Sequence, residues 1–111
     1  MKKEIRVRCW IDVDSEKFFG LGRVELLDHV DKTGSIAKAA KSMGMSYKKA
    51  WEMVEDLNAR GNKPYVVSRK GKKGGGAELT GTAKKVLTAY VKLKKDLDAV
   101  AKKHGNILKL V

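Results

Sequence analysis

The side chains best suited to chemistry form a short polar and basic run at the start of one predicted helix. They are Ser46, Tyr47, Lys48 and Lys49, followed by Glu52. Lysine can neutralise a phosphate or reach guanine, hydroxyl groups can donate to phosphate oxygens, and glutamate can accept from cytosine or hold a lysine in place. These residue types predict contact with double-stranded DNA. The alternative is an ordinary solvated helix face.

A second basic cluster lies in a glycine-rich stretch. Arg69, Lys70, Lys72 and Lys73 are followed directly by glycines at positions 74, 75 and 76. The β-prone residues on both sides predict a hairpin over residues 65–79, with the basic stretch at its tip. Such a wing could lie along the sugar–phosphate backbone or in the minor groove. The alternative is a loop that faces solvent only.

Residues for catalysis or metal binding are sparse. The chain has one cysteine, Cys9, and two histidines, and no Ser/His/Asp or Cys/His set is indicated. Glu25 and His29 share a helix face with Asp28 adjacent, but carboxylates and one histidine on a helix are usually solvated or salt-bridged. The glycines around Lys72 lack the spacing of a phosphate-binding loop. We therefore expect no enzyme activity, no cofactor and no metal.

The net charge of +12 is unevenly distributed along the chain. Residues 1–34 carry seven basic and seven acidic side chains, residues 35–73 carry ten and three, and residues 74–111 carry eight and three. Because the excess of basic residues begins at residue 35, it favours binding to a polyanion; the alternative is a lysine-rich surface that is only solvated. No apolar run approaches the roughly 18 to 20 residues that span a bilayer, and a single cysteine suits a reducing compartment. We expect a cytoplasmic protein without a membrane partner.

The elements that must position the first cluster follow from helical periodicity. The pattern predicts a helix from Leu21 to Thr33 that stops at Gly34, a second over residues 36–43 capped by Ser35, and a third over residues 46–60 capped by Ser46. Gly44 would allow positive φ in the turn between the last two helices. Residues 35–60 therefore predict a helix-turn-helix, with Ser35 and Lys38 as further DNA contacts.

The packing of this motif is also readable from the sequence. Small residues lie where its two helices must touch: Ala39 and Ala40 on the first and Ala50 on the second. Val54 and Leu57 extend the apolar stripe of the second helix, with Trp51 and Met53 beside it. This leaves the polar and basic run on the opposite, outward face.

Strands and a long helix are predicted to flank the motif. Alternation over residues 4–13 predicts a strand with one buried face, including Cys9, and residues 17–19 predict a short returning strand. A helix over residues 80–103 has apolar positions with heptad spacing, a seam for a second copy of the chain. The seam residues are Val86, Tyr90, Leu93, Leu97 and Val100. The fold class is mostly α with small β elements (α+β), one winged helix-turn-helix domain over residues 1–111 that forms a homodimer.

Four stretches resemble the N-terminal domain of ModE-type molybdate-responsive regulators and, more distantly, LysR-type regulators. They are residues 22–27 (GRVELL), 33–40 (TGSIAKAA), 43–51 (MGMSYKKAW) and 74–80 (GGGAELT). The resemblance implies a dimeric winged helix that binds operators, with DNA contacts at Ser46, Tyr47, Lys48, Lys49 and Glu52 and in the wing at Arg69, Lys70, Lys72 and Lys73. In that family a separate C-terminal domain binds molybdate. This sequence is expected to lack it, and the alternatives are a stand-alone DNA-binding form that is constitutive, one that responds to a separate effector, or one that works with a partner protein.

Two functions remain open from the sequence. The first is a sequence-specific, dimeric DNA-binding transcription regulator. The second is an architectural or helix-mediated interaction module whose basic surface binds without sequence preference. A specific reader should bind one duplex roughly 10³-fold or more tighter than a random duplex at matched salt.

Overall fold

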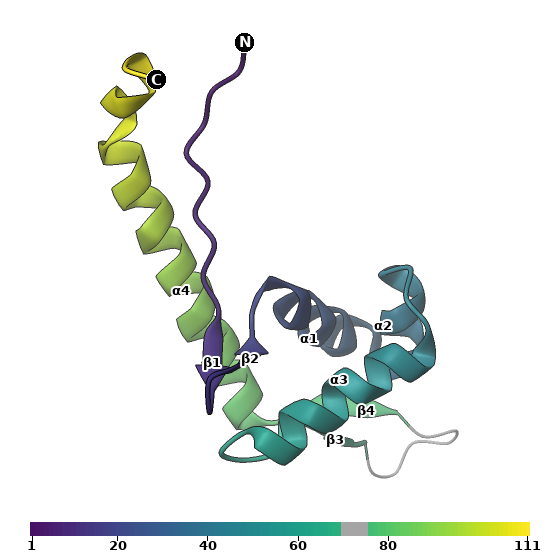
Figure 1. Cartoon of the computed structure of the whole chain (residues 1–111). Helices are drawn as coiled ribbons and strands as arrows, with labels where there is room; N and C mark the ends of the chain where they lie inside the picture. The colour runs from purple at the N-terminus through teal and green to yellow at the C-terminus, as the bar shows by residue number, and fades with distance from the viewer. Residues whose placement is uncertain (70–75) are drawn as a thin grey trace.

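The computed structural model describes residues 1–69 and 76–111. Across these residues the chain forms four α-helices, two antiparallel strand pairs and a short 3₁₀-helix (Figure 1). In chain order they are β1 (Ile11–Val13), β2 (Glu16–Phe19), α1 (Leu21–Thr33), α2 (Ile36–Ser42), α3 (Tyr47–Arg60), β3 (Val66–Ser68), β4 (Ala77–Leu79), α4 (Gly81–Lys103) and η1 (Gly105–Lys109). The predicted α+β winged helix-turn-helix fold is confirmed.

Local signals set the ends of α1 and α2. Gly34 follows α1 in the left-handed conformation, with φ of 69°, and its N–H donates to the Val30 carbonyl at 2.8 Å. This conformation suits glycine because it has no Cβ. Ser35 then begins α2, and its side chain accepts a hydrogen bond from the Lys38 N–H at 3.1 Å. The predicted stop at Gly34 and cap at Ser35 are both confirmed.

The turn between α2 and α3 is a Schellman-type helix end. The Gly44 N–H donates to the Lys41 carbonyl at 3.1 Å and the Met45 N–H donates to the Ala40 carbonyl at 3.0 Å, which satisfies two free carbonyls of α2. Gly44 has φ of 67°, as predicted. Ser46 then caps α3 by accepting from the Lys49 N–H at 3.1 Å. The turn therefore fixes where α3 leaves α2.

The core lies between α1, α2, α3, the first half of α4 and the two strand pairs. Its largest fully buried side chains are Phe19, Leu26, Leu27, Val30 and Leu57. Ala39, Ala40 and Ala50 are almost completely buried, as expected for residues that let α2 and α3 approach closely. Burial of this apolar surface is the main stabilising contribution to the fold, at about 25 cal/mol per Å².

The hairpin β3–β4 is joined to the corner between α1 and α2. Val66 pairs with Leu79, Val67 with Glu78 and Ser68 with Ala77. Beyond this ladder, the Ala77 N–H donates to the Gly34 carbonyl at 2.9 Å. The base of the wing is therefore hydrogen-bonded to the residue that precedes the helix-turn-helix.

The N-terminal strand is much shorter than predicted. Only residues 11–13 form a strand, which pairs with β2 through a turn at Asp14 and Ser15, both at positive φ. Residues 1–10 run alongside α4 as an extended chain and pair with no strand among the described residues (Figure 1). The predicted strand over 4–13 is thus wrong for residues 4–10, because alternation alone does not supply a neighbouring strand.

Cys9 and Tyr90 attach this N-terminal segment to α4. The Tyr90 hydroxyl donates to the Cys9 carbonyl at 2.8 Å, and its ring packs edge-on against Phe19 with centroids 5.5 Å apart. Cys9 is half-buried outside any strand, which corrects the prediction of a buried strand residue. Tyr90 is only 5% exposed, so the structure moves it from the predicted seam of α4 into the core.

Thr80 begins α4 by accepting from the Ala83 N–H at 3.1 Å. Beyond Tyr90 the helix extends away from the rest of the fold, and the chain measures 58 × 30 × 21 Å along its principal axes (Figure 1). Leu93 and Val100 are exposed there, and Val86 and Leu97 are half-buried. In the described part of the chain, none of the helices has both the length and the apolar character that a bilayer crossing requires.

Candidate nucleic-acid interface

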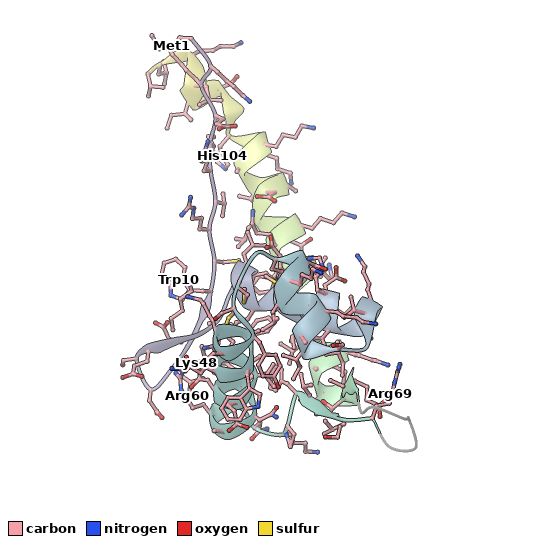
Figure 2. The ribbon with its side chains drawn as sticks, turned by 90° about the vertical axis from the view of Figure 1, so that its right-hand side faces the viewer. Met1, Trp10, Lys48, Arg60, Arg69 and His104 are labelled. Carbon is pink, nitrogen blue, oxygen red and sulfur yellow. The ribbon has the colours of Figure 1, made fainter. Side chains whose placement is uncertain are left out.

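The N-terminal half of α3 presents one open face to solvent. Tyr47 is 55% exposed, and Lys48, Lys49 and Glu52 are also exposed. The opposite face is buried through Ala50, Val54 and Leu57. Figure 2 shows Lys48 on α3, and Arg69 directly after β3. No part of the described chain covers the predicted contact residues of this helix.

The charges on this face are only weakly paired. Lys48 Nζ lies 4.0 Å from Glu52 Oε1, and their side chains are 85% and 59% exposed. An exposed ion pair at this distance contributes little to the stability of the fold, and salt screens it further. The Lys48 ammonium is therefore available to an external anion.

Ser46 and Ser35 act first as helix caps. Each side-chain oxygen accepts a backbone N–H at 3.1 Å, so the hydroxyl proton of each remains free to be donated. A hydroxyl group can serve both roles because it carries one proton and two lone pairs. The structure is thus compatible with the predicted hydrogen bonds from these serines to phosphate.

The beginnings of α2, α3 and β4 meet at a shallow depression. It is lined by Ser35, Ile36, Ala37, Tyr47, Gly76 and Ala77. Two predicted contact residues, Ser35 and Tyr47, are thereby brought together beside the base of the wing. Lys38 is exposed on α2. The predicted site residues on α2 and α3 therefore share one side of the molecule.

Of the four basic wing residues predicted to contact DNA, Arg69 is the one that the structure describes. It is half-buried, and its guanidinium packs against the α1–α2 corner so closely that a Cβ at Gly34 would lie 2.9 Å from Nη1. Arg69 therefore helps to hold the wing base in place. Lys70, Lys72 and Lys73 lie outside the described residues.

Comparison with known proteins finds sequence similarity to molybdenum-responsive regulators. No protein-family model matches the chain. The molybdenum-pterin-binding protein MopB of Rhodobacter capsulatus is 44% identical over 72 residues, 64% of this chain and 27% of that protein. The DNA-binding transcriptional dual regulator ModE of Escherichia coli K12 is 39% identical over 70 residues, 61% of this chain and 26% of that protein. This chain resembles the N-terminal part of ModE-type regulators.

The resemblance covers only part of the ModE-type relatives. The chain spans about a quarter to a third of the length of these curated relatives, from 26% to 35%. Among solved structures, a complex of the CbnR DNA-binding domain with DNA matches with a TM-score of 0.49 and 18% identity, over 80% of this chain and 93% of that one.

Trp51 is a residue of the α3 surface that the sequence patterns did not single out. The sequence placed it beside the apolar stripe, whereas the structure leaves it 44% exposed. It follows Tyr47 by four residues, about one helical turn, and this spacing could have predicted that the two rings share one face of α3. The exposed face of α3 in this ModE-like chain thus carries two aromatic rings among its charges.

Asp56, Arg23 and Arg60 form a second unpredicted group, here called the Asp56 cluster. One carboxylate oxygen of Asp56 accepts from Arg23 at 2.6 Å and from Arg60 at 2.8 Å. Partial burial acts to raise the pKa of Asp56, but the hydrogen bonds and charges of the two guanidinium groups outweigh it, so the pKa is lowered from 3.8. The cluster joins α3 to α1.

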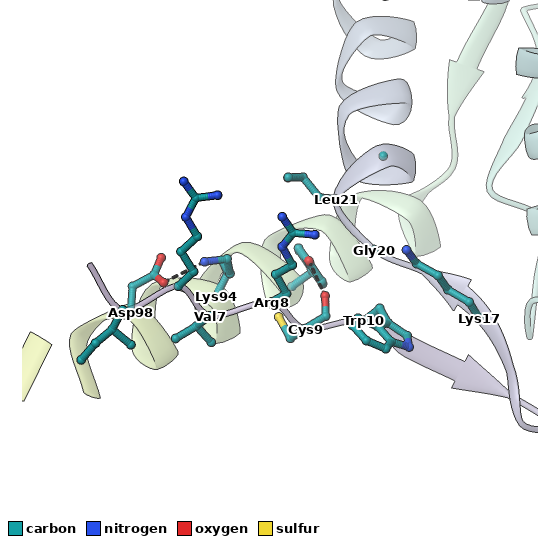
Figure 3. A pocket seen from close by; sticks show the side chains of 13 residues that line it. Val7, Arg8, Cys9, Trp10, Lys17, Gly20, Leu21, Lys94 and Asp98 are labelled. Atoms are coloured by element: carbon teal, nitrogen blue, oxygen red, sulfur yellow. Dashed lines mark hydrogen bonds and ion pairs between the residues drawn. The ribbon is translucent and has the colours of Figure 1, made fainter. Parts of the chain in front are cut away.

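A pocket lies away from α3, between the N-terminal segment, the start of α1 and α4. It has a volume of about 600 Å³ and is lined by Arg8, Trp10, Lys17, Lys94 and Asp98, among others (Figure 3). Lys94 is paired with Asp98 at 2.7 Å, and the Lys17 ammonium lies 5.4 Å from the Trp10 ring centroid. Within the described residues, no group of three or more His, Cys, Asp and Glu side chains is placed to bind a metal.

Proposed function

We propose that this chain is the DNA-binding part of a ModE-type transcription regulator, and that it recognises a specific sequence in double-stranded DNA. The observation that carries the proposal is the open face of α3. Its N-terminal half exposes Tyr47, Lys48 and Lys49, while Ala50 and Leu57 hold the opposite side in the core. A helix that is packed on the core through one face and exposed to solvent on the other can enter the major groove.

The charge distribution supports a nucleic-acid ligand. The excess of basic residues begins at position 35, where the helix-turn-helix starts, while residues 1–34 have no net charge. The Escherichia coli relative is a DNA-binding transcriptional regulator, and its similarity to this chain favours the same ligand here. In this proposal residues 1–111 form one winged helix-turn-helix domain.

The roles of the contact residues follow from their positions. Tyr47, Lys48, Lys49 and Glu52 on α3 would face base edges and the groove walls. Ser46 precedes them, and Ser35 and Lys38 at the start of α2 would contact phosphates. Arg69, Lys70, Lys72 and Lys73 would place the wing on the sugar–phosphate backbone, where contacts position the protein without reading sequence.

We further propose a homodimer that assembles through the distal part of α4. Leu93 and Val100 are exposed, Val86 and Leu97 are half-buried, and the four residues keep the heptad spacing after Tyr90 is removed from the set. Such a seam stabilises a helix only when a second helix covers it. Two α3 helices would then enter major grooves about 34 Å apart, or a multiple of this distance.

The decisive experiment is selection of bound duplexes from a random DNA pool, followed by competition of the selected duplex against random DNA at one salt concentration. We expect the selected duplex to bind roughly 10³-fold or more tighter. Equal affinity for selected and random duplexes would reject sequence-specific recognition and favour the non-specific architectural module. The absence of any DNA binding at low salt would reject both functions.

A further inference from the structure

The aromatic side chains of this chain separate into a buried and an exposed group. Phe18, Phe19, Tyr65 and Tyr90 are all at most 5% exposed. The exposed members are Trp10, Tyr47 and Trp51, and Trp10 is covered in part by the Lys17 ammonium. The other two exposed rings both belong to α3, the proposed recognition helix.

Trp51 lies on the side of α3 that faces the wing. Asn58 follows it by seven residues, two helical turns, and therefore lies on the same side. The Asn58 amide donates to the Val66 carbonyl at 3.0 Å, and its oxygen accepts from the Tyr65 N–H at 2.7 Å, so this side contacts the strand β3. In the other direction Tyr47 borders the depression at the start of α2 and β4. Trp51 therefore lies between Tyr47, which the proposed function assigns to DNA, and the part of α3 that contacts β3 of the wing.

A large apolar ring at this position needs an apolar partner in the ligand. Each base pair presents donors and acceptors in the major groove, and the thymine C5 methyl is the apolar group there. An exposed tryptophan of a recognition helix would gain little from guanine or cytosine edges, whereas it would remove a methyl group from water.

We infer that Trp51 is a specificity-determining residue that recognises the C5 methyl group of a thymine in each half-site. This inference rests on the proposed function and names one base that α3 reads. Lys48 and Lys49, which precede Trp51 by three and two residues, supply the phosphate attraction that holds the helix in the groove.

The test uses deoxyuridine, which lacks the thymine methyl but keeps the Watson–Crick pairing. Each thymine of the selected duplex is replaced in turn, and affinity is measured for the whole chain by fluorescence anisotropy. For the unaltered chain we expect about fourfold weaker binding at one thymine per half-site, which corresponds to about 0.8 kcal/mol for one buried methyl group. Trp51→Ala should bind the thymine and deoxyuridine duplexes equally, while Trp51→Phe should keep part of the difference.

Other outcomes separate this inference from the proposed function. If the chain prefers its selected duplex but does not distinguish thymine from deoxyuridine at any position, Trp51 does not read the methyl and the DNA-binding proposal stands. The same conclusion holds if Trp51→Ala keeps the discrimination, or if its affinity for DNA is unchanged, which would point to a protein partner for the ring. Trp10→Ala, an exposed tryptophan outside α3, is the matched control and should retain the fourfold difference. Circular dichroism checks that each variant is folded.

Discussion

Arg23 Nη1 lies 2.6 Å from Asp56 Oδ2, which joins α1 to α3 across 33 residues of sequence. The same oxygen binds Arg60, whose guanidinium also donates to the carbonyls of Val13 and Glu16 at 3.2 and 3.1 Å. The Asp56 cluster thus links two helices and the N-terminal hairpin. Because both arginines lie partly out of water, the carboxylate is the group that balances their charge.

Replacing this carboxylate should weaken the fold. We expect Asp56→Asn to lower the free energy of unfolding at neutral pH by roughly 1–3 kcal/mol, because two partly buried guanidinium groups lose their charged acceptor. Urea unfolding followed by circular dichroism measures the change. Asp96→Asn is the matched control, since Asp96 makes an exposed pair with Lys92 at 3.2 Å and should cost less than about 1 kcal/mol. Equal losses in the two variants would contradict the role of the cluster.

The unaltered chain and Asp56→Asn can also be compared as a function of pH. The folded-state pKa of Asp56 is lowered from 3.8, so the folded chain releases this proton more readily than the unfolded chain. The stabilisation is therefore complete above about pH 4 and is lost as the pH falls further through the folded-state pKa. The difference in unfolding free energy between the unaltered chain and Asp56→Asn should be constant near neutral pH and should shrink below about pH 4. A difference that stays constant in acid would indicate a steric cause.

Gly44 tests the turn of the helix-turn-helix. Its φ is +67° and an added Cβ would meet no atom within 4 Å, so the cost of a side chain comes from the backbone conformation alone. We expect Gly44→Ala to destabilise the chain by about 1–2 kcal/mol. Gly22→Ala is the control: Gly22 lies in α1 with equally open surroundings, and alanine there should be neutral or stabilising by up to about 1 kcal/mol. Thermal unfolding that shows no difference between the variants would argue against a strained turn.

The basic residues of α3 and of the wing should differ in what they contribute to DNA binding. Lys72→Ala and Lys73→Ala should weaken binding to every sequence and reduce the salt dependence by about one unit for each phosphate that is no longer neutralised. Lys48→Ala and Lys49→Ala should in addition relax the preference for the selected duplex. Affinities for selected and random duplexes over a salt series distinguish the two effects. Identical behaviour of all four variants would mean that α3 does not read sequence.

The seam on α4 predicts which substitutions disrupt the dimer. Leu93 and Val91 are both exposed on α4, at 45% and 55%, but only Leu93 belongs to the seam. Analytical ultracentrifugation at micromolar concentration should show a dimer for the unaltered chain and for Val91→Glu, and a monomer for Leu93→Glu. A monomeric unaltered chain, with and without DNA, would remove the dimer from the proposal.

The features that the sequence predicted correctly depend on neighbouring residues. Ser35, Ser46, Gly34 and Gly44 mark helix ends through contacts within a few positions, and all four behave as expected. The alanine contact between α2 and α3 was also predictable, because the short turn between these helices forces them to pack against each other. For the candidate site, the same local rules placed Tyr47, Lys48 and Lys49 on the outward face.

The features that were missed depend on residues far apart in the chain. Tyr90 fits a heptad pattern, but its hydroxyl reaches Cys9, 81 residues earlier, and this contact places it in the core. Residues 4–10 alternate like a strand, yet hydrogen-bonded pairing needs a partner that the pattern does not specify. Arg23 and Asp56 show no periodic relationship that would predict their contact. The exposure of Trp51 was not predicted, because a position beside an apolar stripe does not tell how much of the side chain other elements will cover.

Because α4 extends beyond Tyr90, the structure has two parts: a packed part up to Tyr90 and a projecting part formed by the rest of α4. Up to Tyr90, helices and strands pack on one another, whereas farther along α4 the N-terminal segment lies at its side (Figure 1). Under the proposed assignment, DNA reading belongs to the packed part and assembly to the projecting one. A few substitutions on the projecting part of α4 would therefore change which subunits dimerise without changing which DNA sequence is bound. A hybrid carrying a foreign zipper after Tyr90 should keep its DNA sequence preference.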